Sequence, residues 1–142
     1  MKRNMVTRRE GPFVLTRQNT EEPSDDEWNE YLRVLAAQLR EIDPKNLRIM
    51  IYTDGGVMNS EQRKRLAQTL GDCQPKVACI SNSVKVRFAG AMIALFQRNY
   101  RQFSVAEMKH AFAHLELKPA QREFAEKVLY ELEAELYSDW SG

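Results

Sequence analysis

The chain has 142 residues, of which 43% are hydrophobic and 29% are charged, and its net charge is +1. This length suffices for about one domain with a conventional core, and a net charge so close to zero excludes a grossly basic nucleic-acid-binding protein. No apolar run approaches the roughly 18 residues of a membrane helix, and no apolar segment follows the first positive charges. We therefore expect a cytoplasmic protein with no membrane segment.

Charge is distributed unevenly along the chain. Residues 1–17 carry five basic groups against one acidic group, and residues 18–30 carry six acidic groups. Residues 76–110 carry six basic groups against one acidic group, and residues 118–142 carry six acidic groups against three basic ones. Such segregation steers a charged partner in some proteins and reflects solvated helix faces in others. Cys73 and Cys79 fit free thiols in a reducing compartment.

The first predicted elements are a β-hairpin and a helix. Two short β-rich runs, residues 5–8 and 13–17, flank a turn that contains a Gly-Pro pair. A capping box from Ser24 to Glu27 predicts that the helix begins near Asp25. Its apolar residues recur at spacings of three and four, which places them on one face toward the sheet. They are Trp28, Tyr31, Leu32, Leu35, Ala36, Leu39 and Ile42.

Two βα units follow the first helix. The apolar run of residues 47–52 is typical of a central strand covered on both faces, and Asp54-Gly55-Gly56 ends it. Asn59 or Ser60 caps the next helix, and Gly71 suits the position that closes it. Residues 77–80 form the second strand. The helix that follows, residues 84–96, is apolar all around its axis, so we expect it to be largely buried or covered by a partner.

The remaining elements are a short strand at residues 100–103 and two helices. A capping box from Ser104 to Glu107 begins the first, and Pro119 begins the second. The last helix is acidic and amphipathic, so it either folds back on the sheet or docks on another chain. Its apolar residues recur every four positions, at Phe124, Val128, Leu132 and Leu136.

The predicted fold class is therefore α/β. We expect a small, mostly parallel sheet of about four to five strands, with an N-terminal hairpin, flanking helices and an extra C-terminal amphipathic helix. We divide the chain into an α/β domain at residues 1–117 and a C-terminal acidic helix and tail at residues 118–142.

The predicted working edge is formed by the loops at the carboxyl ends of the central strands, where parallel sheets usually meet ligands or partners. No nucleophile with a nearby base stands out, and the glycine pair lacks the further glycines of a phosphate-binding loop. His110 and His114 lie one helical turn apart but have no evident third metal ligand. We expect no enzyme activity, no cofactor and no metal. The candidate partner- or anion-binding residues are Asp54, Gly55, Gly56, Asn59, Ser60, Ser81, Ser83, Lys85 and Arg87.

Several short stretches carry a resemblance to a known family. They are Phe13-Val14-Leu15-Thr16, Ser24-Asp25-Asp26-Glu27, Tyr52-Thr53-Asp54 with Gln62-Arg63, and Ser81 to Arg87 continuing through Ala94-Leu95-Phe96 to Phe103. Together they resemble the STAS domain of bacterial anti-sigma factor antagonists, and more closely its divergent bacterial branch of unassigned role. The resemblance covers about residues 5–117. It implies that Asp54 matches the family's loop aspartate and that Ser60 is the serine nearest to the phosphoacceptor position.

The resemblance also implies a function, a non-enzymatic regulatory adaptor. It would bind a protein partner through the loops at residues 54–60 and 81–87, with no nucleic acid or membrane as partner. Two alternatives stay open. One is a structural or assembly subunit, including a homo-oligomer, that docks through its C-terminal helix and the tail from Tyr137 to Trp140. The other is a carrier of a small ligand, because STAS-like domains resemble lipid-binding and nucleotide-binding relatives in outline.

Overall fold

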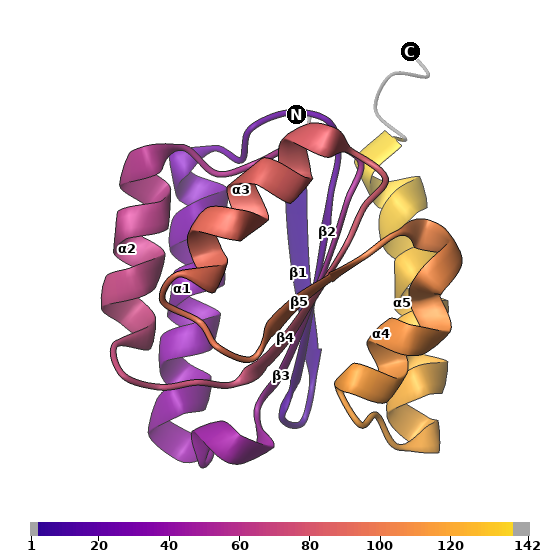
Figure 1. The fold of residues 1–142 in the computed structure, drawn as a ribbon. Coiled ribbons are helices and arrows are strands. Elements are labelled where there is room, and N and C mark those ends of the chain that lie inside the picture. The colour runs from indigo at the N-terminus through magenta and orange to yellow at the C-terminus, as the bar shows by residue number, and fades with distance from the viewer. Residues whose placement is uncertain (1–2, 138–142) are drawn as a thin grey trace.

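The computed structural model describes residues 3–137, which form one five-stranded sheet with helices on both faces (Figure 1). The first two strands form an antiparallel hairpin, and every later neighbour is parallel. The predicted α/β class, with its hairpin and mostly parallel sheet, is confirmed. The strands follow chain order across the sheet, as β1 (Met5–Glu10), β2 (Phe13–Gln18), β3 (Arg48–Thr53), β4 (Lys76–Ile80) and β5 (Tyr100–Phe103).

The helices divide into two layers. Three helices connect neighbouring parallel strands and share one face of the sheet, as expected when successive right-handed crossovers move in one direction. The last two helices cover the opposite face (Figure 1). The first layer holds α1 (Asp25–Glu41), α2 (Ser60–Leu70) and α3 (Val84–Ala94), and the second holds α4 (Met108–His114) and α5 (Pro119–Tyr137). Two short 3-10 turns, Pro44–Asn46 and Val105–Glu107, precede β3 and α4. No helix within residues 3–137 is long and apolar enough to span a bilayer.

The helix starts follow the predicted caps. Ser24 and Glu27 form the capping box of α1, and Glu27 Oε2 also accepts hydrogen bonds from the backbone N–H groups of Asn4 and Met5, at 2.8 and 3.0 Å. This carboxylate therefore joins the helix to the hairpin. Of the two residues predicted to cap α2, the structure uses Asn59. Gly71 closes that helix with a φ of 55°, which favours glycine.

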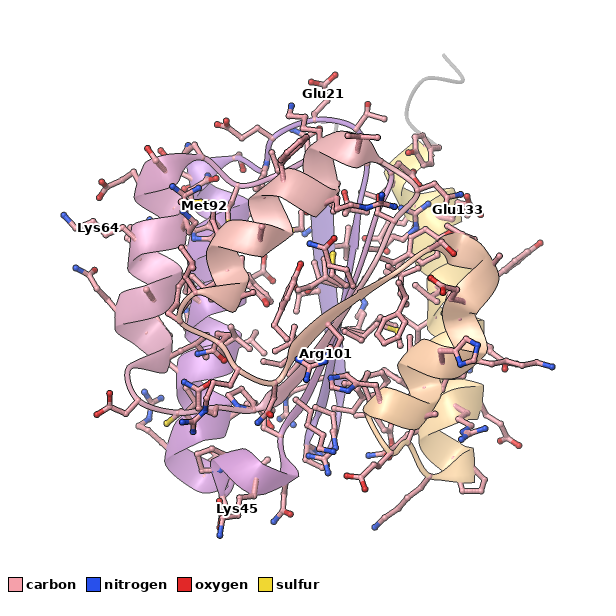
Figure 2. All side chains as sticks on the ribbon, viewed as in Figure 1. Glu21, Lys45, Lys64, Met92, Arg101 and Glu133 are labelled. Atoms are coloured by element: carbon pink, nitrogen blue, oxygen red, sulfur yellow. The ribbon has the colours of Figure 1, made fainter. Side chains whose placement is uncertain are left out.

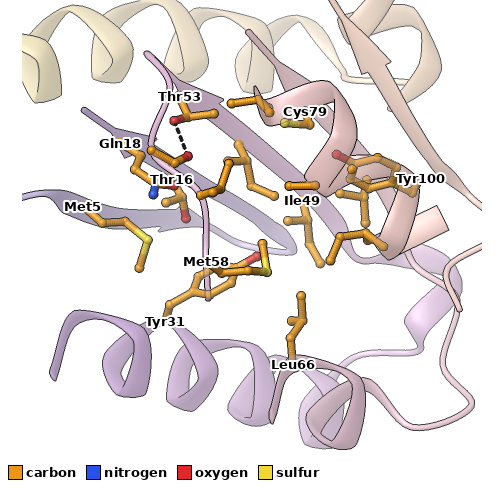
Figure 3. A pocket seen from close by; sticks show the side chains of 18 of the residues that line it. Met5, Thr16, Gln18, Tyr31, Ile49, Thr53, Met58, Leu66, Cys79 and Tyr100 are labelled. Atoms are coloured by element: carbon orange, nitrogen blue, oxygen red, sulfur yellow. Dashed lines mark hydrogen bonds between the residues drawn. The ribbon is translucent and has the colours of Figure 1, made fainter. Parts of the chain in front are cut away.

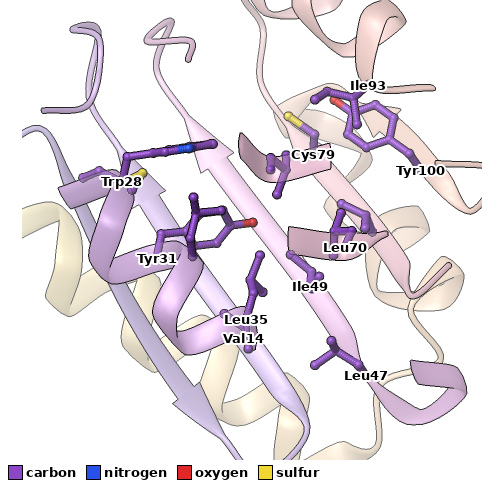
Figure 4. Packing of buried hydrophobic residues seen from close by; sticks show 14 of the residues in the cluster. Val14, Trp28, Tyr31, Leu35, Leu47, Ile49, Leu70, Cys79, Ile93 and Tyr100 are labelled. Atoms are coloured by element: carbon purple, nitrogen blue, oxygen red, sulfur yellow. The ribbon is translucent and has the colours of Figure 1, made fainter. Parts of the chain in front are cut away.

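Two hydrophobic cores lie on the two faces of the sheet, because successive side chains of a strand point to opposite sides. Ile49 joins the core beneath α1, α2 and α3, whereas its neighbour Met50 joins the core beneath α4 and α5. Figure 4 shows the first core, in which Trp28 and Tyr31 of α1 face Ile49. The indole N–H of Trp28 donates to the Gln62 carbonyl at 2.9 Å, which ties α1 to α2.

The C-terminal helix α5 packs on its own sheet, over β1 and β2. Val128, Leu132 and Leu136 are buried there, and the half-buried Phe124 meets the ring of Phe13 edge-on, with ring centroids 5.9 Å apart. Of the two predicted arrangements of this helix, the structure has the one in which it folds back on the sheet, and docking on another chain stays a prediction. The stripe covers the apolar face of β1 and β2, so it is unavailable to a partner while α5 stays in place. The predicted docking tail beyond Tyr137 lies outside the described residues.

Candidate functional site

The loops predicted to form the working edge do come together in the structure. They follow β3 and β4, which are parallel neighbours, so both loops leave the same edge of the sheet. The approach is close at Gly55, where an added Cβ would lie 3.8 Å from Ser83 Oγ and 3.9 Å from Thr20. The acidic loop before α1 is therefore the third member of this edge. We term this set of loops, residues 19–24, 54–59 and 81–83, the carboxyl edge.

Asp54 is held by an ion pair inside the protein. Its Oδ2 atom lies 3.0 Å from Nη2 of Arg17, whose side chain is only 3% exposed. The guanidinium of Arg17 also stacks over the Tyr52 ring at 4.4 Å and donates to the Gln18 carbonyl at 2.7 Å. A buried arginine needs such partners, because an unpaired buried charge is strongly destabilising. Asp54 thus compensates Arg17 instead of standing free for a partner.

The end of α5 joins the same cluster. The hydroxyl of Tyr137 donates a hydrogen bond to Asp54 Oδ2, and Glu133 Oε1 lies 3.4 Å from Arg17 Nη2. Partial burial and the adjacent Asp54 carboxylate raise the pKa of Tyr137 to about 12. Sequence reasoning did not find this cluster, because its members lie on three elements far apart in the chain and share no motif.

Glycine is required at the two positions after Asp54 for different structural reasons. Gly55 has a φ of 147°, a backbone conformation that favours glycine. Gly56 is required for space, since an added Cβ would lie 2.1 Å from the Glu21 carbonyl oxygen and 2.8 Å from that of Asn19. The backbone N–H of Gly56 donates to the Asn19 carbonyl at 2.9 Å. The glycines therefore hold the acidic loop against β3, and neither forms a phosphate cradle.

Asn59 and Ser60 stand at the start of α2. The Asn59 side chain accepts a hydrogen bond from the Gln62 backbone N–H at 2.8 Å and donates one to a Glu22 carboxylate oxygen at 3.0 Å. Both polar atoms of this side chain are therefore hydrogen-bonded within the protein. Ser60 is the first residue of α2 and is exposed. A phosphate at this position would meet the free N–H groups of the first helical turn. Phosphorylation of Ser60 remains a prediction.

A polar cavity of about 70 Å³ lies where β4, β5 and the start of α3 meet. Three of the predicted partner- or anion-binding residues line this cavity, namely Ser81, Ser83 and Arg87. Lys85 does not line it. Ser83 Oγ accepts from the Val86 backbone N–H at 3.4 Å and Ser81 Oγ from that of Ser83 at 3.1 Å, so both serines cap local backbone.

The lining of this cavity also includes a carboxylate, that of Glu107, which was not among the predicted binding residues. Glu107 Oε1 accepts from the Ser104 backbone N–H at 2.8 Å, and hydrogen bonds from Ser104 hold the pKa of Glu107 below its usual value. The cavity therefore combines one cation with one carboxylate. This balance is less favourable to an anion than the predicted set of serines and cations.

The outer face of α3 separates the two alternatives predicted for this helix, burial within the chain and cover by a partner. Only Val86, Gly90 and Ile93 are buried, so burial within the chain is wrong for the outer half, and cover by a partner stays a prediction. Four large apolar side chains stand in solvent instead, with Met92 labelled in Figure 2. They are Val84, Phe88, Met92 and Leu95, with exposed fractions of 63, 74, 44 and 80%. We term these four residues the α3 stripe.

A second, apolar cavity lies between α1, α2, α3 and the sheet (Figure 3). Its volume is about 60 Å³, and Ala89, Gly90 and Ile93 of α3 contribute to its lining. Buried pockets for small ligands usually measure about 300–1,000 Å³. Gln97 lines the cavity, and its Oε1 atom accepts no hydrogen bond within residues 3–137.

Two further side chains near these sites, Cys79 and His114, have defined surroundings. Burial raises the pKa of the Cys79 thiol to about 11, which keeps it protonated and a poor nucleophile. His114 Nε2 lies 2.9 Å from the Asn99 carbonyl oxygen. Within residues 3–137 no three His, Cys, Asp or Glu side chains are grouped as metal ligands, and Cys73 and Cys79 are free thiols.

Comparison of the chain with protein-family models, with curated proteins and with solved structures gave no match. The STAS-like resemblance therefore rests on the residues quoted above and stays a prediction. The chemistry of this chain's own surfaces is therefore what supports a function.

Proposed function

We propose that this protein is a non-enzymatic interaction module that binds a protein partner on the outer face of α3. The observation that carries the proposal is the α3 stripe, which leaves four large apolar side chains in solvent along one helix. Apolar area buried against a partner contributes about 25 cal/mol per Å², so a stripe of this kind favours association. Contiguous exposed apolar surface on a small protein commonly marks such an interface.

The sequence analysis predicted that a partner binds through the loops at the carboxyl edge, and these loops contribute less to the present proposal. Asp54 and Asn59 are engaged in contacts within the protein. Lys85 and Arg87 are exposed and belong to α3 itself. The partner thus meets α3 and its two cations first, and Ser60 stays a candidate for phosphorylation on the neighbouring helix.

The two alternative functions have weaker support. An assembly subunit that docks through α5 would have to give up the packing of Leu132 and Leu136 on its own sheet, where each is 1% exposed. A ligand carrier would have to open a cavity that now measures about 60 Å³. Both would break existing contacts, whereas the α3 stripe is available without any rearrangement.

Site-specific photo-crosslinking in the protein's own cells tests the proposal. A photoreactive phenylalanine analogue replaces Phe88 in one variant and Tyr130 in a control variant, because Tyr130 is 79% exposed on α5. We expect one discrete protein adduct from position 88 and none from position 130. Excess wild-type chain should compete the adduct away, and the Leu95→Asp variant should not. Equal adducts at the two positions, or none at position 88, would contradict the proposal.

A further inference from the structure

The α3 stripe runs along the length of its helix. Val84, Phe88 and Leu95 recur at spacings that place them on one line, directly opposite the buried residues Val86, Gly90 and Ile93. An 11-residue helix is about 16 Å long at a rise of about 1.5 Å per residue. A straight apolar line of this length on a convex helix matches the apolar face of another helix lying beside it.

The charged residues of the segment that carries the stripe all have one sign. Residues 84–101 contain four basic residues and no acidic residue. Lys85 and Arg87 lie on opposite sides of the stripe in the helical projection, and Arg98 follows the end of α3. Neither Lys85 nor Arg87 forms an ion pair within residues 3–137, although Arg87 lines the polar cavity together with Glu107. An occupant with carboxylates on both sides of its apolar face would complement them.

We propose that the partner element seated on the α3 stripe is an amphipathic helix whose apolar face is flanked by Asp and Glu. This inference rests on the proposed function and names the chemistry of its partner. The apolar contacts supply most of the binding free energy. The exposed ion pairs add little binding free energy, but they select an acidic helix over a basic one.

A second copy of this chain is a poorer occupant. If two α3 helices packed against each other in antiparallel orientation, Lys85 and Arg87 of one copy would face Arg98 of the other. With no acidic residue in 84–101, the two-fold interface would bring together cations only. Like charges across an interface disfavour that pairing.

An anionic membrane surface is also a poorer occupant. The acidic loop with Glu21 and Glu22 lies at the carboxyl edge, beside the start of α3, because Thr20 and Ser83 both approach Gly55. A flat bilayer that met the α3 stripe would also meet these carboxylates, and anionic lipid headgroups would repel them. A single helix can lie along α3 without crossing that loop.

Designed peptides test the inference directly. The probe is a fluorescein-labelled, helix-stapled peptide of about 15 residues, with Leu at every third or fourth position and Glu at the flanking positions. A matched peptide carries Lys in place of every Glu. We expect fluorescence anisotropy to show the Glu peptide binding the wild-type chain about tenfold more tightly than the Lys peptide, with a preference that salt weakens.

Variants of the protein assign this preference to α3. Lys85→Glu combined with Arg87→Glu should reverse it by about tenfold, and Leu95→Asp should abolish binding of both peptides. Tyr130→Asp, the matched control on α5, should leave both affinities unchanged. Circular dichroism and thermal unfolding confirm that each variant is folded, which we expect because all these side chains are exposed.

Other results would overturn the inference. Equal binding of the two peptides, or binding that persists in the Leu95→Asp variant, would remove the acidic helix as the occupant. Binding to vesicles of phosphatidylserine and phosphatidylcholine, lost in the Leu95→Asp variant, would replace it with a membrane. A chain dimer that the same variant dissociates would replace it with a second copy. If neither peptide binds while position 88 still crosslinks a protein, the inference fails and the proposed function stands.

Discussion

Helices α3 and α5 carry similar numbers of large apolar residues but have opposite relations to the sheet. In α5 these residues recur every four positions, and Leu132 and Leu136 lie in the core beneath it. In α3 they surround the axis, and the sheet covers only one side, so Phe88 and Leu95 remain in solvent. In α5 the apolar residues form a single face, and the sheet buries that face. In α3 the apolar residues extend beyond the face that the sheet covers, and those outside that face remain exposed.

The inner face of α3 makes close contacts with β5 that favour its observed orientation. Gly90 lies against β5, where an added Cβ would fall 1.3 Å from Gln102 Nε2 and 2.5 Å from Tyr100 Oη. Gln102 also donates to the Val86 and Arg87 carbonyls of α3, at 3.4 and 3.3 Å. A side chain at position 90 would therefore displace Gln102 from these contacts, so Gly90 favours the observed side of α3 facing the sheet.

The largest expected difference between the two helices is the effect of removing a leucine. Leu132→Ala in α5 should lower the free energy of unfolding by about 2–5 kcal/mol, because the side chain is 1% exposed and leaves a cavity. Leu95→Ala in α3 should change it by less than about 0.5 kcal/mol, because the side chain is 80% exposed. Urea unfolding followed by circular dichroism measures both. A loss at Leu95 as large as that at Leu132 would show that the stripe is structural.

A smaller effect is expected at the ion pair below the end of α5. Asp54→Asn removes the carboxylate 3.0 Å from Arg17, whose side chain is buried, and should cost about 1–3 kcal/mol. Glu133→Gln removes a carboxylate that is 62% exposed and 3.4 Å away, so we expect a cost below about 0.5 kcal/mol. The same urea titrations compare the two variants. An equal cost would mean that α5, through Glu133, compensates Arg17 as strongly as Asp54 does.

Much of the fold was predictable from local signals. The capping boxes at Ser24 and Ser104, the break at Asp54 and the proline at 119 each mark an element boundary that depends on residues close in sequence. The alternation of strands with helices predicted the parallel sheet. The strand order was left open, since it depends on contacts between segments far apart in the chain.

The candidate site was predictable only in part. The convergence of the two βα loops follows from parallel pairing, and the structure shows it at Gly55 and Ser83. The ion pair of Asp54 with Arg17 and the position of Glu107 in the polar cavity could not be predicted, because each joins separate elements. For α3 the sequence left two alternatives, burial within the chain or cover by a partner. The composition of this helix shows that it is apolar on all sides, but not how many of those sides the rest of the domain covers.

The smallest expected effect is the pH dependence that Tyr137, at the end of α5, adds to the free energy of unfolding. Its pKa is about 12 in the folded protein and about 10 in the unfolded chain, so folding binds its proton more tightly. The resulting stabilisation is complete below about pH 10 and is lost as the pH rises from about 10 to 12. Tyr137→Phe should therefore cost about 0.5–1.5 kcal/mol at neutral pH and progressively less above pH 10.

The control for this measurement is Tyr130→Phe, a substitution of the exposed tyrosine on the same helix. Urea unfolding of the wild type and both variants from about pH 7 to 11 should show the difference from wild type shrinking for Tyr137→Phe alone. A difference that stays constant with pH would mean that the hydroxyl does not hold its proton on Asp54. In that case α5 would be fixed by its apolar face, Val128, Leu132 and Leu136, without help from the carboxyl edge.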